Sequence, residues 1–328
     1  MKYPDLSIIV PVYNAEHLLE RFFLSLEIQK LRGSTYEVIV ADGGSTDKSV
    51  EICKKHKAIV IHNSQQLAEP GVVLGIKQAS SDLVMVLATD NIFEKNNALA
   101  DIISVFEDKK IAAAFPIQAA AQNDSMFSKY INAFTDPYTH FVYWDASNAR
   151  TFKKIYTTIA HTSLYDVYDY SSNSSFPLLA LAQGFTVRKI FIEKRKNQYD
   201  DVLVIYDLIK QGKQIAYVHG VTLNHYTADT IGQFIQKQRR AVGNAMIRKN
   251  SGISLRGTYF SKSQQVRRYM YFPYSLSIIA PFVVGCVQFV KTRESMWLIH
   301  PYIVYISAVV ILYEVGKTVL QRVLKKMI

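Results

Sequence analysis

The chain has 328 residues, a hydrophobic content of 49% and a formal net charge of +11 at pH 7. This length allows one large or two ordinary domains, each with its own core, and the two cysteines exclude a disulfide framework. The charge indicates an anionic partner. Because no nucleic-acid-binding motif accompanies it, we expect anionic lipid or sugar phosphate, and no nucleic acid.

The N-terminal region alternates between short apolar runs and amphipathic segments. The runs predict strands and have the sequences LSIIVPVY, YEVIVAD, AIVIH, LVMVLATD and IAAAFP. The segments between them predict helices, among them AEHLLERFFLSLEIQ, STDKSVEICKKH and KNNALADIISVFED. This alternation predicts an α/β domain with a mostly parallel sheet and helices on both faces. Ligands of such sheets bind beyond the carboxyl ends of the strands, where Asp42 and Asp90 fall.

Two apolar runs lie near the C-terminus, at residues 269–290 and 296–316. Each has about the 20 residues that cross a bilayer core. The short connector KTRES predicts that they form a transmembrane hairpin with both outer ends on one side. Two buried helices of a soluble domain, or a hairpin that lies in the membrane interface, are the alternatives.

Basic residues predict the orientation of this hairpin. Lys291 and Arg293 lie in the connector, whereas the outer ends carry Arg267, Arg268, Lys317, Arg322, Lys325 and Lys326. Because positive charge concentrates on the cytoplasmic side, we expect a multi-pass protein of the cell membrane with its N-terminal domain on the cytoplasmic face. The opening MKYPDLSIIV has no signal-peptide pattern, which agrees with that orientation.

Three features of the N-terminal region occur together: the turn VPVYN, the later loop ADGGSTDKSV, and a strand that ends at Asp90. This combination resembles the nucleotide-sugar-binding start of family 2 glycosyltransferases, which have the GT-A fold. The resemblance covers residues 5–115 well and residues 184–243 more loosely. It implies a membrane-anchored inverting transferase built like the dolichyl-phosphate or polyprenyl-phosphate sugar synthases.

The resemblance implies a binding site for a nucleotide-sugar donor, either a UDP-sugar or a GDP-sugar. Pro11, Val12 and Tyr13 would line the pocket for the base, and Asp42 would accept hydrogen bonds from the base or the ribose. Taken alone, the Asp-Gly-Gly sequence that begins at Asp42 is more typical of a turn.

The resemblance also implies a divalent metal, and here the sequence departs from the family. Members place two aspartates, one residue apart, on the diphosphate-bound ion, whereas this chain has Ala88 and Asp90. One carboxylate with substrate phosphates and waters can still hold Mg²⁺ or Mn²⁺, so we expect a weakened site with Asp90, Asn91 and His225 as ligands. The alternatives are that Asp90 is only the solvated end of a strand and that His225 is structural.

The segment YDDVLVIYDLIKQGKQIAYV resembles the acid-base helix of the family. Asp201 falls at the catalytic aspartate, Asp200 at the preceding glutamate and Gly212 at the glycine that ends the helix. Asp201 would take the proton from the acceptor hydroxyl as it attacks the anomeric carbon. The alternative is that both aspartates only stabilise the helix N-terminus through its dipole.

Gln236, Arg239 and Arg240 resemble the Gln-x-x-Arg-Trp motif of polymerising members, with arginine in place of tryptophan. Tryptophan there stacks on the acceptor sugar, so its absence favours a single addition over processive polymerisation. The arginines would clamp the diphosphate, or form a basic helix face on anionic headgroups.

We therefore predict a cytoplasmic GT-A domain (1–228), basic interfacial helices (229–268), two transmembrane helices (269–316) and a basic cytoplasmic tail (317–328). The predicted activity moves one sugar from a nucleotide donor to a membrane-embedded lipid acceptor, either polyprenyl phosphate or a lipid-linked glycan. The alternative is a degenerate transferase that acts as a scaffold for membrane glycan assembly. The sequence leaves open the sugar, the nucleotide, the acceptor and whether the chain forms a homo-oligomer.

Overall fold

The computed structural model describes residues 3–134, 136–147, 151–173, 177, 184–193, 201–226, 228–247, 257 and 260–327. The chain divides into two compact units. The first comprises Met1–Ala119 and Ala149–Tyr226, and the second comprises Ala120–Asn148 and Thr227–Ile328.

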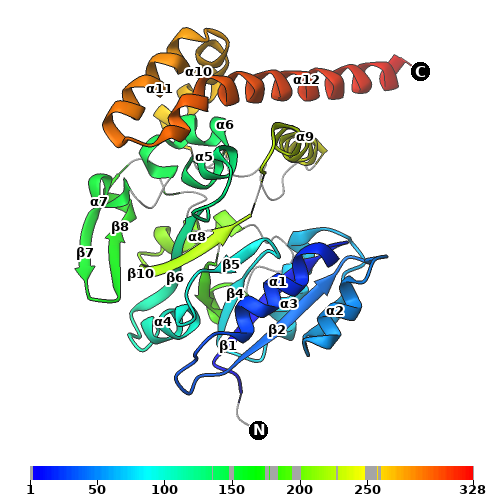
Figure 1. Cartoon of the computed structure of the whole chain (residues 1–328), viewed down its shortest axis with the longest axis vertical. Helices are drawn as coiled ribbons and strands as arrows, with labels where there is room; N and C mark the ends of the chain where they lie inside the picture. The colour runs from blue at the N-terminus through cyan, green and yellow to red at the C-terminus, as the bar shows by residue number, and fades with distance from the viewer. Residues whose placement is uncertain are drawn as a thin grey trace. The chain divides into compact units, whose positions relative to one another are not determined.

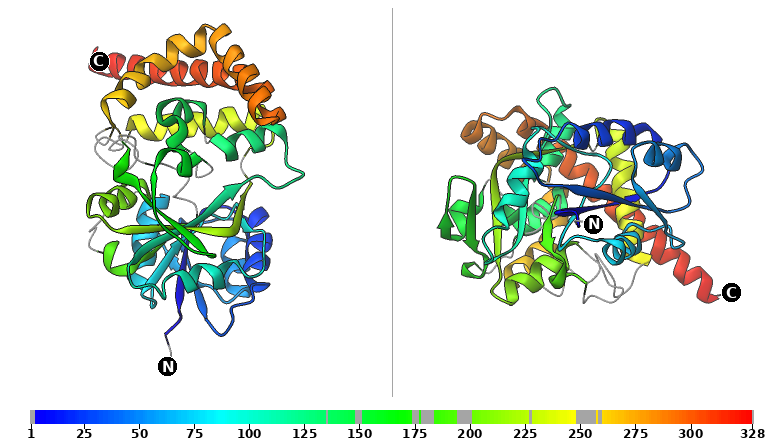
Figure 2. Two further views of the ribbon diagram at one scale, coloured as in Figure 1. Left: turned by 90° about the vertical axis from the view of Figure 1, so that its left-hand side faces the viewer. Right: turned by 90° about the horizontal axis from the view of Figure 1, so that it is seen from below.

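A 10-stranded sheet forms the centre of the first unit, within its described residues (Figure 1). Its spatial order is β3 (Ile59–His62), β2 (Tyr36–Asp42), β1 (Leu6–Val12), β4 (Leu83–Val86), β9 (Thr186–Arg188), β6 (Ile111–Ala119), β10 (Gln214–His225), β8 (Tyr165–Asp169) and β7 (Thr157–His161), and β5 (Asn91–Phe93) pairs with β10. The strands fan out with the twist usual in such sheets (Figure 2).

The sheet is mixed. Strands β1 to β4 run parallel, as the alternation of strands and helices predicts. The short β9 then runs antiparallel between β4 and β6, and β6 runs parallel to β10. Strands β2, β1, β4, β6 and β10 therefore point in one direction, and their carboxyl ends lie along one edge of the sheet.

Helices cover both faces of this sheet, as predicted. They are α1 (Glu16–Glu27), α2 (Ser49–Lys55), α3 (Ala68–Gln78), α4 (Ala98–Val105), the short α7 (Phe152–Ile155) and α8 (Asp201–Lys210). On one face, Ile8 and Val10 of β1 belong to the same core cluster as Phe22 of α1. On the other face, a Cβ atom on Gly75 of α3 would lie 2.4 Å from Cγ2 of Ile9, so only glycine lets α3 approach β1 this closely. This two-sided burial explains why β1 is apolar along almost its whole length.

The second unit is built from helices in its described part. They are α5 (Met126–Phe134), α6 (Pro137–Tyr143), α9 (Ile231–Ile247), α10 (Lys262–Leu276), α11 (Ile279–Thr292) and α12 (His300–Met327). Helix α12 packs along α9, where the buried Gln238 amide donates a hydrogen bond to Oγ of Ser307 at 2.6 Å. Its C-terminal part extends away from α10 and α11 (Figure 1).

The first apolar run, residues 269–290, is not one straight helix. Helices α10 and α11 together have the length and composition of a membrane span, but they meet at a bend of 96°. Pro281 has no N–H to donate to the carbonyl oxygen of Ser277, and the Ser277 hydroxyl instead accepts the N–H of Ala280 at 3.2 Å. The break itself is at Ile278, which has a φ of +58° between α10 and α11. Pro281 lies in the first turn of α11, where a missing N–H is tolerated, and Ser277 helps to begin that helix.

The second apolar run, residues 296–316, lies within one long helical segment. Ser295–Lys325 covers 31 residues, reaches a mean hydropathy of 1.8, and has the length and composition to cross a membrane. Helix α12 also continues through the residues expected to form a tail, up to Met327. Among the described residues, this segment is the one unbent candidate for a membrane span, and the bent pair α10 and α11 is the other candidate.

Candidate functional site

The loops after β1 and β2 are tied together at the carboxyl edge of the sheet. Oδ1 of Asn14 accepts the N–H of Thr46 at 2.9 Å. The Asp47 carboxylate accepts the N–H of Ser49 at 2.9 Å and that of Glu16 at 3.1 Å, which lie in the first turns of α2 and α1. These bonds satisfy N–H groups that have no partner within their own helices. These hydrogen bonds thereby fix the loop after β1 against the loop after β2.

Asp42 is the last residue of β2, and only 6% of it is exposed. Its carboxylate accepts the N–H of Gly44 at 2.9 Å and that of Ser45 at 3.1 Å. Gly44 has a φ of +85°, a conformation that glycine adopts without strain. Asp42 therefore closes a turn, and its contact with a nucleotide stays a prediction.

The three residues predicted to line a base pocket differ in exposure. Tyr13 is 55% exposed, and a Cβ atom on Gly43 would lie 3.3 Å from its ring, so the ring lies against a position without a side chain. Val12 is 4% exposed and its side chain belongs to the core. Pro11 is partly buried. Tyr13 thus offers a surface for stacking, whereas Val12 can offer only backbone atoms.

Asn63 is a further polar residue of this edge, and the sequence patterns do not single it out. It follows β3, donates its backbone N–H to the Asp42 carbonyl at 2.8 Å and donates its Nδ2 to the Leu67 carbonyl at 2.7 Å. Only 2% of Asn63 is exposed, and its Oδ1 has no hydrogen-bond partner among the described residues. A buried acceptor without a partner is unfavourable, which makes Asn63 a further candidate for contact with a ligand.

Asp90, Asn91 and His225 come together at the same edge. Oδ2 of Asp90 lies 3.3 Å from Nε2 of His225, and Oδ1 of Asp90 accepts Nδ2 of Asn91 at 3.1 Å. The cause is strand pairing: β5 runs antiparallel to β10 with Asn91 opposite His225, and the Asp90 carbonyl accepts the N–H of Tyr226 at 2.9 Å. A residue late in the chain is thereby fixed beside two that follow β4.

The donor atoms of this cluster fit a divalent cation. Asn91 is 1% exposed, and within the described part of the chain its Oδ1 has no hydrogen-bond partner. Two ligand atoms at about 2.1 Å from a common ion lie about 3.0 to 3.4 Å apart. The 3.3 Å between Asp90 and His225 falls in that range. The Asp90 carboxylate and Nε2 of His225 are therefore spaced for one ion, and the role of these two side chains and of Asn91 as ligands stays a prediction.

Gln118 of β6 contacts the other nitrogen of the His225 ring, at 2.5 Å between its amide group and Nδ1. If the amide oxygen faces the ring, it accepts Nδ1–H and leaves the Nε2 lone pair for a metal. If the amide NH₂ faces the ring, Nε2 carries the proton and donates to Asp90. Ligand histidines usually have such a partner on their second nitrogen. No sequence motif marks Gln118, because the contact depends on the pairing of β6 with β10.

Two neighbouring side chains have structural roles. The guanidinium of Arg21 on α1 lies 3.5 Å from the ring centroid of Tyr226, which holds the chain after β10 beside α1. Burial, and then the nearby charge of Asp42, raises the pKa of the Cys53 thiol to about 12. This thiol stays protonated at neutral pH and is not a nucleophile.

The predicted catalytic aspartates lie at the start of α8. Asp201 is the first residue of this helix, but its side chain and all of Asp200 lie outside the described residues. The remainder of the segment has the expected order of helix, glycine and strand, and Gly212 has a φ of +64°. The roles of Asp200 and Asp201 stay predictions.

Gln236, Arg239 and Arg240 lie on α9 in the second unit, and all three are exposed. Nε of Arg239 lies 2.5 Å from Oε1 of Glu314 on α12, and its guanidinium lies 5.7 Å from the ring centroid of Tyr313. Arg239 therefore joins α9 to α12, a contact that the sequence does not predict. Its contact with a diphosphate, like that of its two neighbours, stays a prediction.

Comparison with known proteins shows which protein family this chain matches. The family model described as "Glycosyl transferase family 2" matches residues 7–172. The O-antigen chain rhamnosyltransferase WbaN of Salmonella anatum is 34% identical over 113 residues, which are 34% of this chain and 36% of that protein. The dolichol-phosphate mannosyltransferase of Pyrococcus furiosus is 33% identical over 89 residues, which are 26% of this chain and 25% of that protein. The chain thus matches about a third of the length of the first relative and a quarter of the length of the second.

A solved structure resembles nearly the whole chain. It is the mannosyltransferase PcManGT from Pyrobaculum calidifontis in complex with GDP-Man and Mn²⁺, with a TM-score of 0.55, 12% sequence identity, and coverage of 96% of this chain and 88% of that chain. At this identity the likeness shows the fold alone, and it agrees with the GT-A fold predicted from the sequence.

Proposed function

Because the chain belongs to glycosyl transferase family 2, we propose that it transfers one sugar, with inversion, from a nucleotide-sugar to a lipid acceptor in a membrane. The observation that carries this proposal is the cluster of Asp90, Asn91 and His225 at the edge where β2 ends in Asp42. PcManGT, which shares the fold, is described in complex with GDP-Man and Mn²⁺, and this supports a donor of that class.

In the proposed donor site, Asp90, Asn91 and His225 would hold Mg²⁺ or Mn²⁺ beside the diphosphate. The bound ion would neutralise negative charge on the departing nucleoside diphosphate. Asp42 would accept a hydrogen bond from the ribose or the base, and the exposed Tyr13 ring would stack on the base. The donor is then a UDP-sugar or a GDP-sugar.

At the acceptor, Asp201 is proposed to take the proton of an attacking hydroxyl, because it opens the helix that matches the acid-base segment of the family. A phosphate acceptor is already ionised and needs no base, so Asp201 would then orient it. Asp200 would assist from the preceding position. Single addition, rather than polymerisation, follows from Arg240 in place of the motif tryptophan.

The second unit supports a lipid acceptor. Ser295–Lys325 has the length and composition of a membrane span, and exposed apolar residues such as Phe282 and Leu312 lie on α11 and α12. The matched Pyrococcus furiosus relative is named for dolichol phosphate, a lipid of the class proposed here. Anchoring at the bilayer raises the effective concentration of such an acceptor. The basic residues around the apolar runs favour the cytoplasmic face of the cell membrane for the first unit.

The test is a transfer assay with the full chain in vesicles that contain polyprenyl phosphate. Labelled UDP-sugars and GDP-sugars are supplied in turn with Mn²⁺, and label in the organic phase is counted. We expect transfer from one donor class, loss of transfer in Asp90→Ala, and unchanged transfer in Asp82→Ala, because Asp82 precedes β4 at the opposite edge of the sheet. With a lipid-linked glycan as acceptor, Asp201→Asn should reduce the rate by about 100-fold or more.

A chain that consumes no donor with either lipid would contradict the proposal. That result would favour the alternative of a degenerate transferase that serves as a scaffold, for which Ala88 in place of the first metal-site aspartate is the supporting observation.

A further inference from the structure

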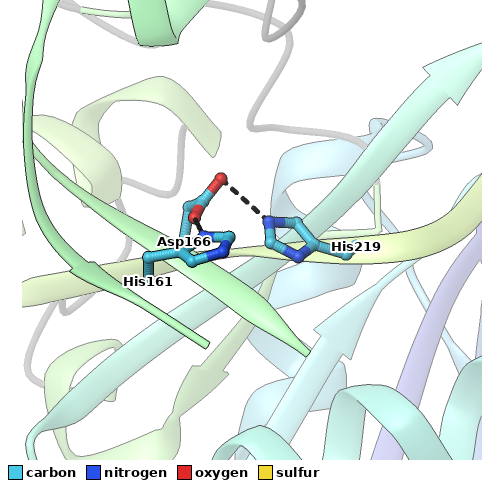
Figure 3. A group of neighbouring side chains, drawn as sticks. All are labelled: His161, Asp166 and His219. Atoms are coloured by element: carbon cyan, nitrogen blue, oxygen red, sulfur yellow. Dashed lines mark hydrogen bonds and ion pairs between the residues drawn. The ribbon is translucent and has the colours of Figure 1, made fainter. Parts of the chain in front are cut away.

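A second group of metal-ligand side chains lies on other strands of the first unit. His161 ends β7, Asp166 lies opposite it on β8, and His219 lies on β10, the next strand. The backbone N–H of His219 donates to the Leu164 carbonyl at 2.8 Å, which holds β10 against the β7–β8 turn. Figure 3 shows both imidazole rings beside the Asp166 carboxylate, each joined to it by a dashed line.

The three side chains already contact one another. Nδ1 of His161 lies 2.5 Å from Oδ1 of Asp166, and Nε2 of His219 lies 2.8 Å from Oδ2 of the same carboxylate. The Tyr168 hydroxyl donates to Oδ2 of Asp166 at 3.1 Å and fixes the carboxylate further. One ligand atom from each of the three residues can be chosen so that all lie within 4.8 Å of one another.

The exposed fraction differs among Asp166, His219 and His161, and the difference suits the binding of an ion. Asp166 is 7% exposed, so its charge is largely withdrawn from water. The side chains of His219 and His161 are 27% and 69% exposed, which leaves a path from solvent to the carboxylate. The buried carboxylate supplies negative charge and the accessible imidazoles supply nitrogen ligands.

The ligand set selects the class of ion. Two imidazole nitrogens and one carboxylate oxygen, with a fourth position open to water, suit Zn²⁺ and the neighbouring transition ions. Mg²⁺ prefers oxygen ligands and would be held poorly. On β10 a bulge lies between Tyr217 and Thr222; the backbone of His219 contacts Leu164 beside β8, whereas His225 lies opposite Asn91 on β5, so this group is separate from the cluster around Asp90.

We propose that His161, Asp166 and His219 form a binding site for a divalent ion of the zinc class that fastens the β7–β8 hairpin to β10. Two ligand atoms of Zn²⁺, each at about 2.0 to 2.2 Å from the ion, are separated by about 3.3 Å. The histidine–carboxylate contacts of 2.5 and 2.8 Å would therefore each lengthen by less than about 1 Å to admit the ion. His161 can make this movement, because β7 is the last strand of the sheet in the described part of the unit.

The first measurement is a Zn²⁺ titration of the full chain by calorimetry, in an Asp90→Ala background so that the proposed donor site contributes little. We expect one saturable Zn²⁺ per chain. Removing a hydrogen-bond partner of a metal ligand costs about 10- to 100-fold in affinity, so His161→Ala, which removes a ligand, should lower the affinity at least tenfold. The matched control is His62→Ala, which removes another exposed histidine at a strand end and should bind Zn²⁺ unchanged.

The second measurement uses Co²⁺ as a spectroscopic substitute for Zn²⁺ in the same background. We expect visible absorption bands of Co²⁺ bound to imidazole and carboxylate, absent in His161→Ala and in Asp166→Asn but present in His62→Ala. Zn²⁺ should also raise the melting temperature of the parent chain but not that of His161→Ala, because an ion that binds only the folded state stabilises it. Equal Zn²⁺ affinity in the parent and in His161→Ala, or no saturable binding at all, would overturn the proposal and leave the group as a hydrogen-bonded cluster.

Discussion

At the scale of single residues, Asn91 is the side chain proposed to accompany the single aspartate, Asp90, in the metal site. The Ala88 carbonyl accepts both the backbone N–H of Asn91 at 3.1 Å and its Nδ2 at 3.2 Å. The amide is therefore held with its nitrogen toward Ala88 and Asp90, and its Oδ1 is the atom without a partner among the described residues. The contact of this oxygen with an ion stays a prediction.

Replacing Asn91 by aspartate should make the fold more dependent on metal. A second carboxylate would lie where Nδ2 now lies 3.1 Å from Oδ1 of Asp90, and like charges this close repel when no cation is present. We expect Asn91→Asp to melt below the wild type in EDTA and to show a larger rise with Mn²⁺, about 2 to 4 °C more for each kcal/mol of added binding energy. Scanning fluorimetry measures both values.

The matched control for this variant is Asn97→Asp. Nδ2 of Asn97 donates to Oδ2 of Asp101 at 2.6 Å, so it also lies beside an aspartate, but away from the strand ends. It should lose stability in EDTA and gain nothing from Mn²⁺. An Mn²⁺-induced rise in Asn91→Asp no larger than that of the wild type would show that Asn91 does not face an ion.

Asp42 and Asp90 could be found from the sequence because each follows an apolar run, and the carboxyl ends of parallel strands meet at one edge. Asp42 ends β2, whereas β4 ends at Val86 and Asp90 lies in the turn before β5, four residues beyond the end of that strand. His225 was found through the family resemblance. Gln118 and Asn63 were missed because their contacts depend on sheet pairing, and Gln118 is separated from His225 by 107 positions. The group of His161, Asp166 and His219 was missed for the same reason.

At the scale of elements, α1 and α2 are joined by an ion pair that depends on pH. His56 follows α2, stacks on Phe23 with 4.7 Å between ring centroids, and contacts Glu27 at 2.6 Å and Glu20 at 3.0 Å. Burial alone would lower the pKa of His56, but the two carboxylates outweigh it and raise the pKa above its usual value. The folded chain therefore holds this proton more tightly than the unfolded chain.

His56→Gln should consequently lose more stability at low pH than at high pH. A raised folded pKa adds stability that is complete below the unfolded value of about 6.5 and disappears as the pH rises through the folded value. We expect the difference in melting temperature between wild type and His56→Gln to be wider at pH 6 than at pH 9. The same difference at both pH values would contradict a charged His56.

The elements that the sequence did not predict are short or depend on distant contacts. β5 and β9 have 3 residues each, too few for an alternating pattern to be recognised. The bend between α10 and α11 lies at Ile278, within a continuous apolar run, and such a run alone predicts one straight helix. Strands β1 and β2, with 7 residues each, were predicted because burial on both faces makes them largely apolar. The predicted strand LVMVLATD is shorter in the structure, where β4 covers only Leu83–Val86.

At the scale of the whole molecule, the chain combines a mixed α/β sheet unit with a helical unit that contains the candidate membrane spans. The helical unit also includes Ala120–Asn148, which precede the last strands of the first unit in the sequence. Residues 116–183 have no recognisable sequence motif, so the sequence predicts neither this membership nor the β7–β8 hairpin. Membrane attachment of the second unit is the property that would bring a lipid acceptor to the chain.

Acidic substitutions on α12 test this attachment. Val309 and Leu312 are 44% and 45% exposed within the structure, and a charged side chain in a bilayer core costs about 2.5 to 3.5 kcal/mol. We expect Val309→Glu with Leu312→Glu to reduce the fraction that floats with vesicles by at least about tenfold. The double variant Leu24→Glu with Ile28→Glu places the same charges on exposed apolar residues at the end of α1 and should float like the wild type. Equal flotation of all three chains would exclude α12 as the anchor.

The most direct test of the central claim is the melting temperature of the purified full chain with UDP, GDP and their sugars, in Mn²⁺ and in EDTA. The proposed donor site predicts a rise with one nucleotide class in Mn²⁺, no rise in EDTA, loss of the rise in Asp90→Ala, and an unchanged rise in Asp82→Ala. A rise that persists in Asp90→Ala, or no rise with any nucleotide, would contradict a metal-dependent nucleotide-sugar site at the edge where Asp90, Asn91 and His225 meet.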